Sequence, residues 1–507
     1  MSSLKKAAIW TTGLALLLKL SGFLRESIVA KEFGASDATD GYFLAFSFIT
    51  LVVAMIATGF NNVFLPMYIK RRKSGEDQDD ANANALLNWT MILFVGVSVI
   101  GWYTAKWLVP FIYPKMSDGA EVIAVEMTEV FFIFMVFIAL AGLLESYLQS
   151  RRIFVPTLVS KLLATLMSAV FALLFSDIWG IYSLAYGFVF GTVVGALIQI
   201  YYLVRSDYSW KPALRMESDF KKAFIILIVP SLLNSVVGQI NLFVNKAFAS
   251  GTGLEGAVTY LNNSQLIVSI PNAIYAATLA AIIFTLMSEQ IDDLPKFKDT
   301  VFRGMEISFI TLVPIAVGLA VVGDAVVSFI YERGLFTAED TANTHLALLF
   351  YLPIIVFQGM QLILSKSMYA RGKTAVVFRI SVTTIAVNLL LNWLLVDRYG
   401  YTALAFAASV VSIYYFTVSM IVVYKDLGWD QLRRFGTTAW RILVPAIVMG
   451  AVVWAAKWLL GAEDWYSLTQ LAVLVPIGII VYAAMLRIIH PAGFKRFLGL
   501  VRRGKKE

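Results

Sequence analysis

Cysteine is absent from this sequence of 507 residues, and histidine occurs only twice, at His345 and His490. Without thiols the chain can form neither a disulfide framework nor a thiolate metal site. Both histidines fall near the ends of apolar segments, where we expect ordinary interfacial side chains rather than ligands. The sequence therefore predicts no metal site.

Charged residues are also scarce. They make up 15% of the chain, whereas hydrophobic residues make up 59%. Soluble domains are about 25% charged and about 45–50% apolar. With a mean hydropathy of +0.77, the chain is predicted to be an all-α integral membrane protein.

Enzyme signatures are missing as well. The sequence has no P-loop, no HExxH and no GxSxG, and we predict no catalytic residue and no cofactor. A membrane-bound polymerase or ligase would need a long external loop rich in arginine, and no predicted outer loop is long enough. An enzyme is therefore disfavoured.

Lysine and arginine exceed the acidic residues, giving a formal net charge of +8. This excess does not predict nucleic-acid binding, because the basic residues recur in short clusters between apolar segments, as topology signals do. Clusters such as Lys70–Lys73, Arg151-Arg152 and Arg433-Arg434 alternate with acidic loops such as Asp118–Glu121 and Glu463-Asp464. The alternation predicts a multi-pass protein with both termini in the cytoplasm.

A spanning helix needs roughly 20 mostly apolar residues, and about fourteen such segments can be counted, the first being retained rather than cleaved. The predicted helices cover residues 7–32, 38–69, 85–113, 124–149, 154–177, 180–205, 222–250, 255–288, 302–331, 342–370, 375–396, 401–425, 436–461 and 465–489.

A short internal repeat divides these helices. Val29 to Phe33, followed by Asp40-Gly41, matches Val244 to Phe248, followed by Glu255-Gly256, at a constant offset. The repeat predicts two six-helix lobes in a parallel pseudo-repeat plus two further C-terminal helices. The corresponding domains are residues 1–215, residues 216–428, and residues 429–507 with a basic cytoplasmic tail.

The stretch from Lys19 to Phe46 carries several charges inside two apolar segments. An ionisable side chain in the bilayer is costly and usually faces a protein-lined, water-filled cavity. Lys19, Arg25 and Glu26 share one helix face, and Asp40 lies on the next helix. We interpret this face as a cationic lining for an anionic group, because guanidinium matches phosphate oxygens bidentately. The alternative is a structural ion pair of Arg25 with Glu26 or Asp40.

Further polar residues extend the candidate site into the second half of the chain. Lys246 occupies the repeat position of Lys31, and Gln265 lies on the following helix, so both are predicted to contact substrate. Asn245, Asn388 and Asn392 are candidates for ion coupling, or for helix packing through their amides. Lys161, Glu306 and Arg379 lie near predicted helix ends, where we expect them to reach the interface.

Several motifs resemble the bacterial lipid II flippases of the MviN/MurJ type, within the multidrug/oligosaccharidyl-lipid/polysaccharide exporter superfamily. The resemblance covers roughly residues 5–425. The matching motifs are Gly22-Phe-Leu-Arg25-Glu26, Phe33-Gly34-Ala35 with Asp40, Tyr331-Glu-Arg-Gly334-x-Phe336-Thr337 with Asp340, Tyr369-Ala-Arg371-Gly372-x-Thr374, and Asn388-x3-Asn392.

The resemblance implies a flippase of the bacterial plasma membrane that moves a polyprenyl-diphosphate-linked wall precursor from the inner to the outer leaflet. The expected substrate is lipid II, used in peptidoglycan synthesis. Two lobes would alternate access to a cationic cavity, and the last two helices would form a groove for the lipid tail. The resemblance also implies sodium or the membrane potential as the energy source; protein partners are not indicated.

The chain departs from the family pattern at four places. Val53 and Ala54 stand where an arginine pair is usual, Leu266 replaces another arginine, and Asn245 replaces a carboxylate associated with sodium. Lys19 stands where an arginine is often found. Two alternatives therefore stay open: a flippase for a capsular, exopolysaccharide or teichuronic-type unit, and a drug or cation antiporter on the same fold.

Overall fold

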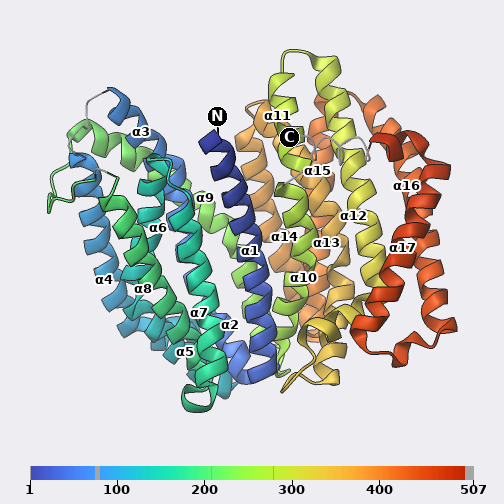
Figure 1. The fold of residues 1–507 in the computed structure, drawn as a ribbon, viewed down its shortest axis with the longest axis horizontal. Helices are drawn as coiled ribbons and strands as arrows, with labels where there is room; N and C mark the ends of the chain where they lie inside the picture. Colours follow the sequence, from blue (N-terminus) through green and yellow to red (C-terminus); the bar gives the residue numbers. More distant parts are fainter. Residues whose placement is uncertain (1, 75–79, 207, 278, 497–507) are drawn as a thin grey trace. The chain divides into compact units, whose positions relative to one another are not determined.

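The computed structural model describes residues 2–74, 80–206, 208–277 and 279–496, and no strand occurs in these ranges (Figure 1). The helices up to the middle of the chain are α1 (Ser2–Phe33), α2 (Asp37–Gly59), α3 (Leu65–Ser74), α4 (Ala81–Ile112), α5 (Asp118–Ile133), α6 (Met135–Ser150), α7 (Val155–Trp179), α8 (Tyr182–Val204) and α9 (Ser218–Ser250). Those that follow are α10 (Ala257–Ala277), α11 (Leu279–Glu289), α12 (Leu294–Tyr331), α13 (Ala338–Ala370), α14 (Thr374–Tyr399), α15 (Thr402–Leu427), α16 (Trp429–Leu459) and α17 (Ser467–Ile489).

Eleven spans in the described part of the chain are long and apolar enough to cross a membrane, or twelve if the bent pair α5 and α6 forms one span. Helix α1 and the pair α10–α11 coincide with the two remaining predicted segments. The prediction of an all-α membrane protein with about fourteen helices is therefore confirmed.

Two predicted helices contain breaks that periodicity did not reveal. Helices α5 and α6 meet at 54° around Phe134. Between α2 and α3, the turn Phe60–Phe64 is π-helical. Pro66 follows this turn, and it has no N–H to offer the carbonyl four residues earlier, so the regular hydrogen-bond ladder cannot continue unchanged there.

The contacts divide the chain into two compact units. Unit 1 comprises residues 1–259 and 333–336, and unit 2 comprises residues 260–332 and 337–507. This division does not test the sequence repeat, so the lobes at 1–215 and 216–428, and the appended segment 429–507, stay predictions.

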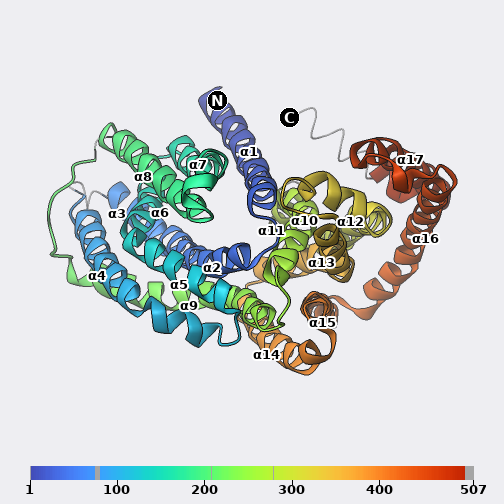
Figure 2. The same ribbon diagram turned by 90° about the horizontal axis from the view of Figure 1, so that it is seen from below.

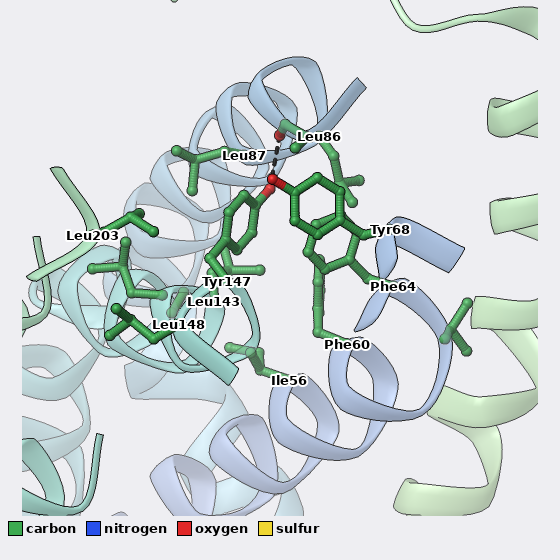
Figure 3. Close-up of a cluster of buried hydrophobic side chains, with 14 of the residues drawn as sticks. Ile56, Phe60, Phe64, Tyr68, Leu86, Leu87, Leu143, Tyr147, Leu148 and Leu203 are labelled. Atoms are coloured by element: carbon green, nitrogen blue, oxygen red, sulfur yellow. Dashed lines mark hydrogen bonds between the residues drawn. The ribbon is translucent and has the colours of Figure 1, made fainter. Parts of the chain in front are cut away.

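Aromatic residues of the π-helical turn build the core at one end of unit 1 (Figure 3). The Phe64 ring stacks on Tyr147 of α6, with centroids 4.7 Å apart. The Tyr147 hydroxyl donates to the Ala83 carbonyl of α4 at 2.7 Å. This bond satisfies a buried hydroxyl that would otherwise cost free energy in an apolar core. The irregular turn is thereby fixed against α4 and α6.

Helices α7 and α8 of unit 1 pack closely along a stripe of glycines. Gly187, Gly191 and Gly195 recur every four residues on α8, so they lie on one face. A Cβ at Gly191 would lie 2.7 Å from the Ala164 Cα, and one at Gly195 would lie 2.9 Å from the Ser160 Cα. Small residues at this spacing let two membrane helices approach backbone to backbone.

In unit 2, α12 is the longest described helix and packs against α13, α16 and α17. Helices α16 and α17, in red, also pack against each other (Figure 1 and Figure 2). Leu474 of α17 is buried in one apolar cluster with Val453 of α16 and Val322 of α12. The two C-terminal helices are thus joined to unit 2 through an apolar seam.

Candidate substrate-binding site

Arg25 on α1 lies between an acid and an aromatic ring. It pairs with Glu26, whose side chain is 4% exposed, and its guanidinium carbon is 5.0 Å from the ring centre of Phe46 on α2. The sequence offered Glu26 and Asp40 as ion-pair partners of Arg25, and in the structure the partner is Glu26. The buried Nε of Arg25 has no hydrogen-bond partner among the described residues. This donor of the guanidinium is thus left without an acceptor in the described part of unit 1.

Lys246 reaches from α9 to α2. Its Nζ donates to the Phe43 carbonyl at 2.9 Å and to the Ser47 hydroxyl at 2.8 Å. It is also within electrostatic reach of Glu26, Asp40 and Arg25. The structure thereby brings four of the predicted site residues, two basic and two acidic, near one another in unit 1. A substrate that used Lys246 would have to compete with α2.

The Asp40 carboxylate caps the start of α10. It accepts hydrogen bonds from the backbone N–H groups of Val258 at 3.3 Å and Thr259 at 2.9 Å, and from the Thr259 hydroxyl at 2.7 Å. A carboxylate is favourable there because the first N–H groups of a helix lack partners and the helix dipole is positive at this end. A reciprocal contact is made by Glu255, which precedes α10. Its carboxylate accepts a hydrogen bond from the Asp37 N–H at the start of α2, at 3.3 Å.

Two glycines of the family motifs bring distant segments together in unit 1. Gly34 ends α1 with φ +63°, and Gly334 has φ +61°, a left-handed conformation that favours glycine. The Leu335 N–H donates to the Lys31 carbonyl at 2.9 Å. A Cβ on Gly34 would lie 2.8 Å from the Leu335 carbonyl oxygen. These motif glycines therefore permit the close approach of residues 333–336 to the end of α1.

The other predicted site residues do not join this group in unit 1. Lys19 is exposed on α1, six residues or about two helical turns from Arg25. Gln265 is exposed on α10 and belongs to unit 2. Asn388 and Asn392 are buried on α14 in unit 2, whereas Asn245 lies in unit 1. The substrate and ion-coupling roles of all these residues stay predictions.

The expectation that Glu306 and His490 are interfacial side chains was wrong. The Glu306 side chain is fully buried on α12, and its Oε1 lies 2.7 Å from the His490 Nε2. Its Oε2 lies 2.9 Å from the Arg496 Nη1. The partners are separated by almost 200 residues, so no local pattern could have paired them. They form a polar cluster where α17 ends against α12.

An apolar groove of about 480 Å³ runs along α12, α16 and α17 in unit 2. Pro314 and Gly318 line it from α12, Val453 from α16, and Gly478 and Tyr482 from α17. Almost all of its surface is hydrocarbon, which suits an apolar chain.

Sequence reasoning missed Phe46 and Thr259. Phe46 carries no charge, and Thr259 is one of many threonines in apolar segments. The signal for Thr259 was its position just after Gly256, at the beginning of a helix, where N–H groups need acceptors.

Comparison with known proteins identifies the family. A family model described as "Lipid II flippase MurJ" matches residues 29–477. The lipid II flippase MurJ of Burkholderia cenocepacia is 27% identical over 424 residues, which cover 80% of this chain and 81% of that protein. The probable lipid II flippase MurJ of Buchnera aphidicola (subspecies Schizaphis graminum) is 26% identical over 451 residues, or 86% of each chain.

Solved structures show the same fold. The structure described as "Lipid II flippase MurJ, inward closed conformation" aligns with a TM-score of 0.81 at 20% identity, covering 95% of this chain and 99% of that chain. An inward-facing multidrug resistance MATE family transporter of the MOP superfamily aligns with a TM-score of 0.68 at 14% identity, covering 81% and 94%. The family is one of transporters, which confirms the prediction that this protein is not an enzyme. Because the family model spans most of the sequence, the chain belongs to the lipid II flippase MurJ family.

Proposed function

We propose that this protein moves lipid II, a polyprenyl-diphosphate-linked peptidoglycan precursor, from the inner to the outer leaflet of the bacterial plasma membrane by alternating access. The observation that carries the proposal is the family match over residues 29–477. The arrangement of charge in unit 1 and the apolar groove of unit 2 supply the two kinds of surface that such a lipid needs.

In this proposal Arg25 binds the diphosphate. Its charge is balanced by Glu26, but its Nε lacks a partner among the described residues, so a phosphate oxygen gains a charge-assisted hydrogen bond there. Phe46 holds the guanidinium by a cation–π contact. A guanidinium held in one orientation loses little entropy when it binds phosphate.

The groove between α12, α16 and α17 takes the polyprenyl chain. Its volume of about 480 Å³ is lined by aliphatic side chains with few polar atoms. Burial of apolar surface stabilises such a complex by roughly 25 cal/mol per Å². The diphosphate contacts of Arg25 and the tail contacts of the groove can be tested by separate substitutions.

Both termini lie in the cytoplasm in this proposal. Reporter fusions after Arg215 and Arg434 are expected to report the cytoplasm, and fusions after Asp118 and Glu463 the outside. Two adjacent reporters on the wrong side would contradict the fourteen-helix topology.

Sodium and the membrane potential are the two proposed energy sources, with Asn245, Asn388 and Asn392 as candidate sodium-coupling residues. Transport into vesicles with choline in place of sodium, at a fixed membrane potential, distinguishes the two. Unchanged transport without sodium would contradict a coupling role for these amides.

Complementation tests the proposed function. The gene should restore growth to bacteria depleted of their own lipid II flippase, in a background that lacks capsule and exopolysaccharide synthesis. The Arg25→Ala variant serves as the matched negative control. Failure to restore growth, with loss of a surface polysaccharide when the gene is deleted from its own host, would assign the protein to another lipid-linked glycan.

A further inference from the structure

A second cavity lies inside unit 1, among α1, α2, α6, α7 and α8. Its volume is about 180 Å³, which leaves room for one small group rather than a whole glycan. Most of its wall is apolar, including Leu18 of α1, Val53 of α2 and Phe188 of α8. Its polar members come from three different helices, so only the packed bundle brings them together.

The charged members of this cavity neutralise each other. Glu145 on α6 is 7% exposed and accepts from the Lys161 Nζ of α7 at 2.8 Å. The Gln149 amide donates to the same carboxylate at 3.0 Å. The Lys161 side chain is 40% exposed. Because the ammonium already occupies the carboxylate, the cavity offers no net charge to an ion.

Gln199 on α8 supplies the unsatisfied group. Its side chain lines the cavity and is 2% exposed, and its Oε1 has no hydrogen-bond partner within the described ranges. A buried acceptor without a donor is costly, and such groups in native proteins usually meet a ligand or water. The hydroxyl of Thr192, which also lines the cavity, does not donate to Gln199, because it donates to the Phe188 carbonyl of its own helix at 2.8 Å.

The cavity adjoins the Arg25 site through two aromatic rings. Phe188, in the cavity wall, meets Phe46 edge to face with centroids 5.2 Å apart. Phe46 in turn contacts the Arg25 guanidinium, at 5.0 Å. Along α1, Leu18 in the cavity wall is seven residues from Arg25, so the two share a face and are about 10 Å apart.

We propose that this cavity is a glycan subsite, in which the Gln199 Oε1 accepts a hydrogen bond from a neutral hydroxyl or amide N–H of the substrate's sugar-peptide headgroup. The inference rests on the proposed function, since Arg25 holds the diphosphate next to it. An anion would face two acceptors, Glu145 and Gln199, and a free cation would have to displace Lys161. A neutral donor satisfies Gln199 without disturbing the ion pair.

The Gln199→Leu variant tests the subsite, because leucine nearly preserves the volume and removes the amide. The probes are undecaprenyl diphosphate and lipid II, which share the tail and diphosphate and differ in the headgroup. Binding of each to the full-length protein in nanodiscs is measured together with the Tm. Gln470→Leu is the matched control: Gln470 is 4% exposed on α17 and also has an unpartnered amide atom, but it belongs to unit 2 and does not line the cavity.

We expect the substitution to weaken binding of lipid II while it raises the thermal stability of the protein. Gln199→Leu should bind lipid II about two- to ten-fold more weakly, the range of one hydrogen bond, and bind undecaprenyl diphosphate as the wild type does. Its Tm without ligand should rise, because an unsatisfied polar group is removed. Gln470→Leu should raise the Tm without changing either affinity.

Three outcomes would overturn the subsite. Unchanged lipid II affinity of Gln199→Leu, with a raised Tm, would mean that the cavity holds water only. An equal loss for both lipids would mean that the substitution disturbs the Arg25 site rather than glycan recognition. A wild-type protein that binds neither lipid above a phospholipid background would refute the proposed function as well, and is thus distinguishable from the other two.

Discussion

The Asp40 carboxylate of α2 is bound to Thr259 of α10 through both the backbone N–H, at 2.9 Å, and the side-chain hydroxyl, at 2.7 Å. Asp40 is 5% exposed and Thr259 is 1% exposed, so neither group can exchange this contact for water without movement of the helices. The carboxylate therefore joins α2 to the first turn of α10 and acts as a helix cap supplied from outside the helix.

Asp40→Ala should destabilise the protein by about 1–3 kcal/mol, because two N–H groups and a hydroxyl lose a charged acceptor. Asp40→Asn keeps one acceptor oxygen and should cost less. Thermal unfolding in detergent measures both. Asp118→Asn, at an exposed position on α5, is the control and should melt as the wild type does. A normal Tm for Asp40→Ala would show that the cap contributes nothing to stability.

Substitutions of Arg25 distinguish a role in substrate binding from a structural ion pair. Arg25→Lys keeps the charge but loses the bidentate fork, so partial transport is expected. Arg25→Ala should abolish transport while the protein level stays normal. If the pair with Glu26 only stabilises the fold, Arg25→Ala should instead lower abundance, and exchanging the two charges should restore it. Full transport by a well-expressed Arg25→Ala protein would refute phosphate binding by this residue.

The contact between α7 and α8 should not tolerate even one added methyl group. Gly191→Ala places a Cβ 2.7 Å from the Ala164 Cα, which is backbone and cannot rotate away. Overpacking of this kind costs about 1–3 kcal/mol. Gly96→Ala on α4 is the matched control, since no atom lies within 4 Å of its Cβ. Equal Tm values for the two variants would contradict the close packing of these helices.

Filling the groove of unit 2 should impair tail binding without unfolding the protein. Gly318 lines the groove, and a Cβ at this position would have no atom within 4 Å, so Gly318→Leu has room for its side chain. We expect weaker binding of undecaprenyl diphosphate and an unchanged Tm. Gly436→Leu on α16 is equally unobstructed but lies outside the groove wall, and serves as the control. Unchanged binding by Gly318→Leu would place the polyprenyl chain elsewhere.

Helix number and class followed from the sequence alone, because a spanning helix must satisfy its backbone internally and needs about 20 apolar residues. The predicted segment 401–425, for example, agrees with helix Thr402–Leu427 to within one residue at its start and two at its end. The charges of Lys19 to Asp40 also stood out locally, since ionisable groups are rare in apolar helices. The family motifs, with Gly34 and Gly334, could likewise be read without a structure.

The partners of those charges were decided only by the tertiary structure. Lys246 meets Ser47 across 199 residues of chain, and His490 meets Glu306 across 184. Asp40 was singled out as a site residue, yet its contact with Thr259 depends on how α10 begins beside α2. Gln199 gave no sequence signal, because a single amide in an apolar helix is as compatible with helix packing as with a ligand. Its burial without a hydrogen-bond donor among the described residues arises from five helices packed together, which periodicity along one helix cannot encode.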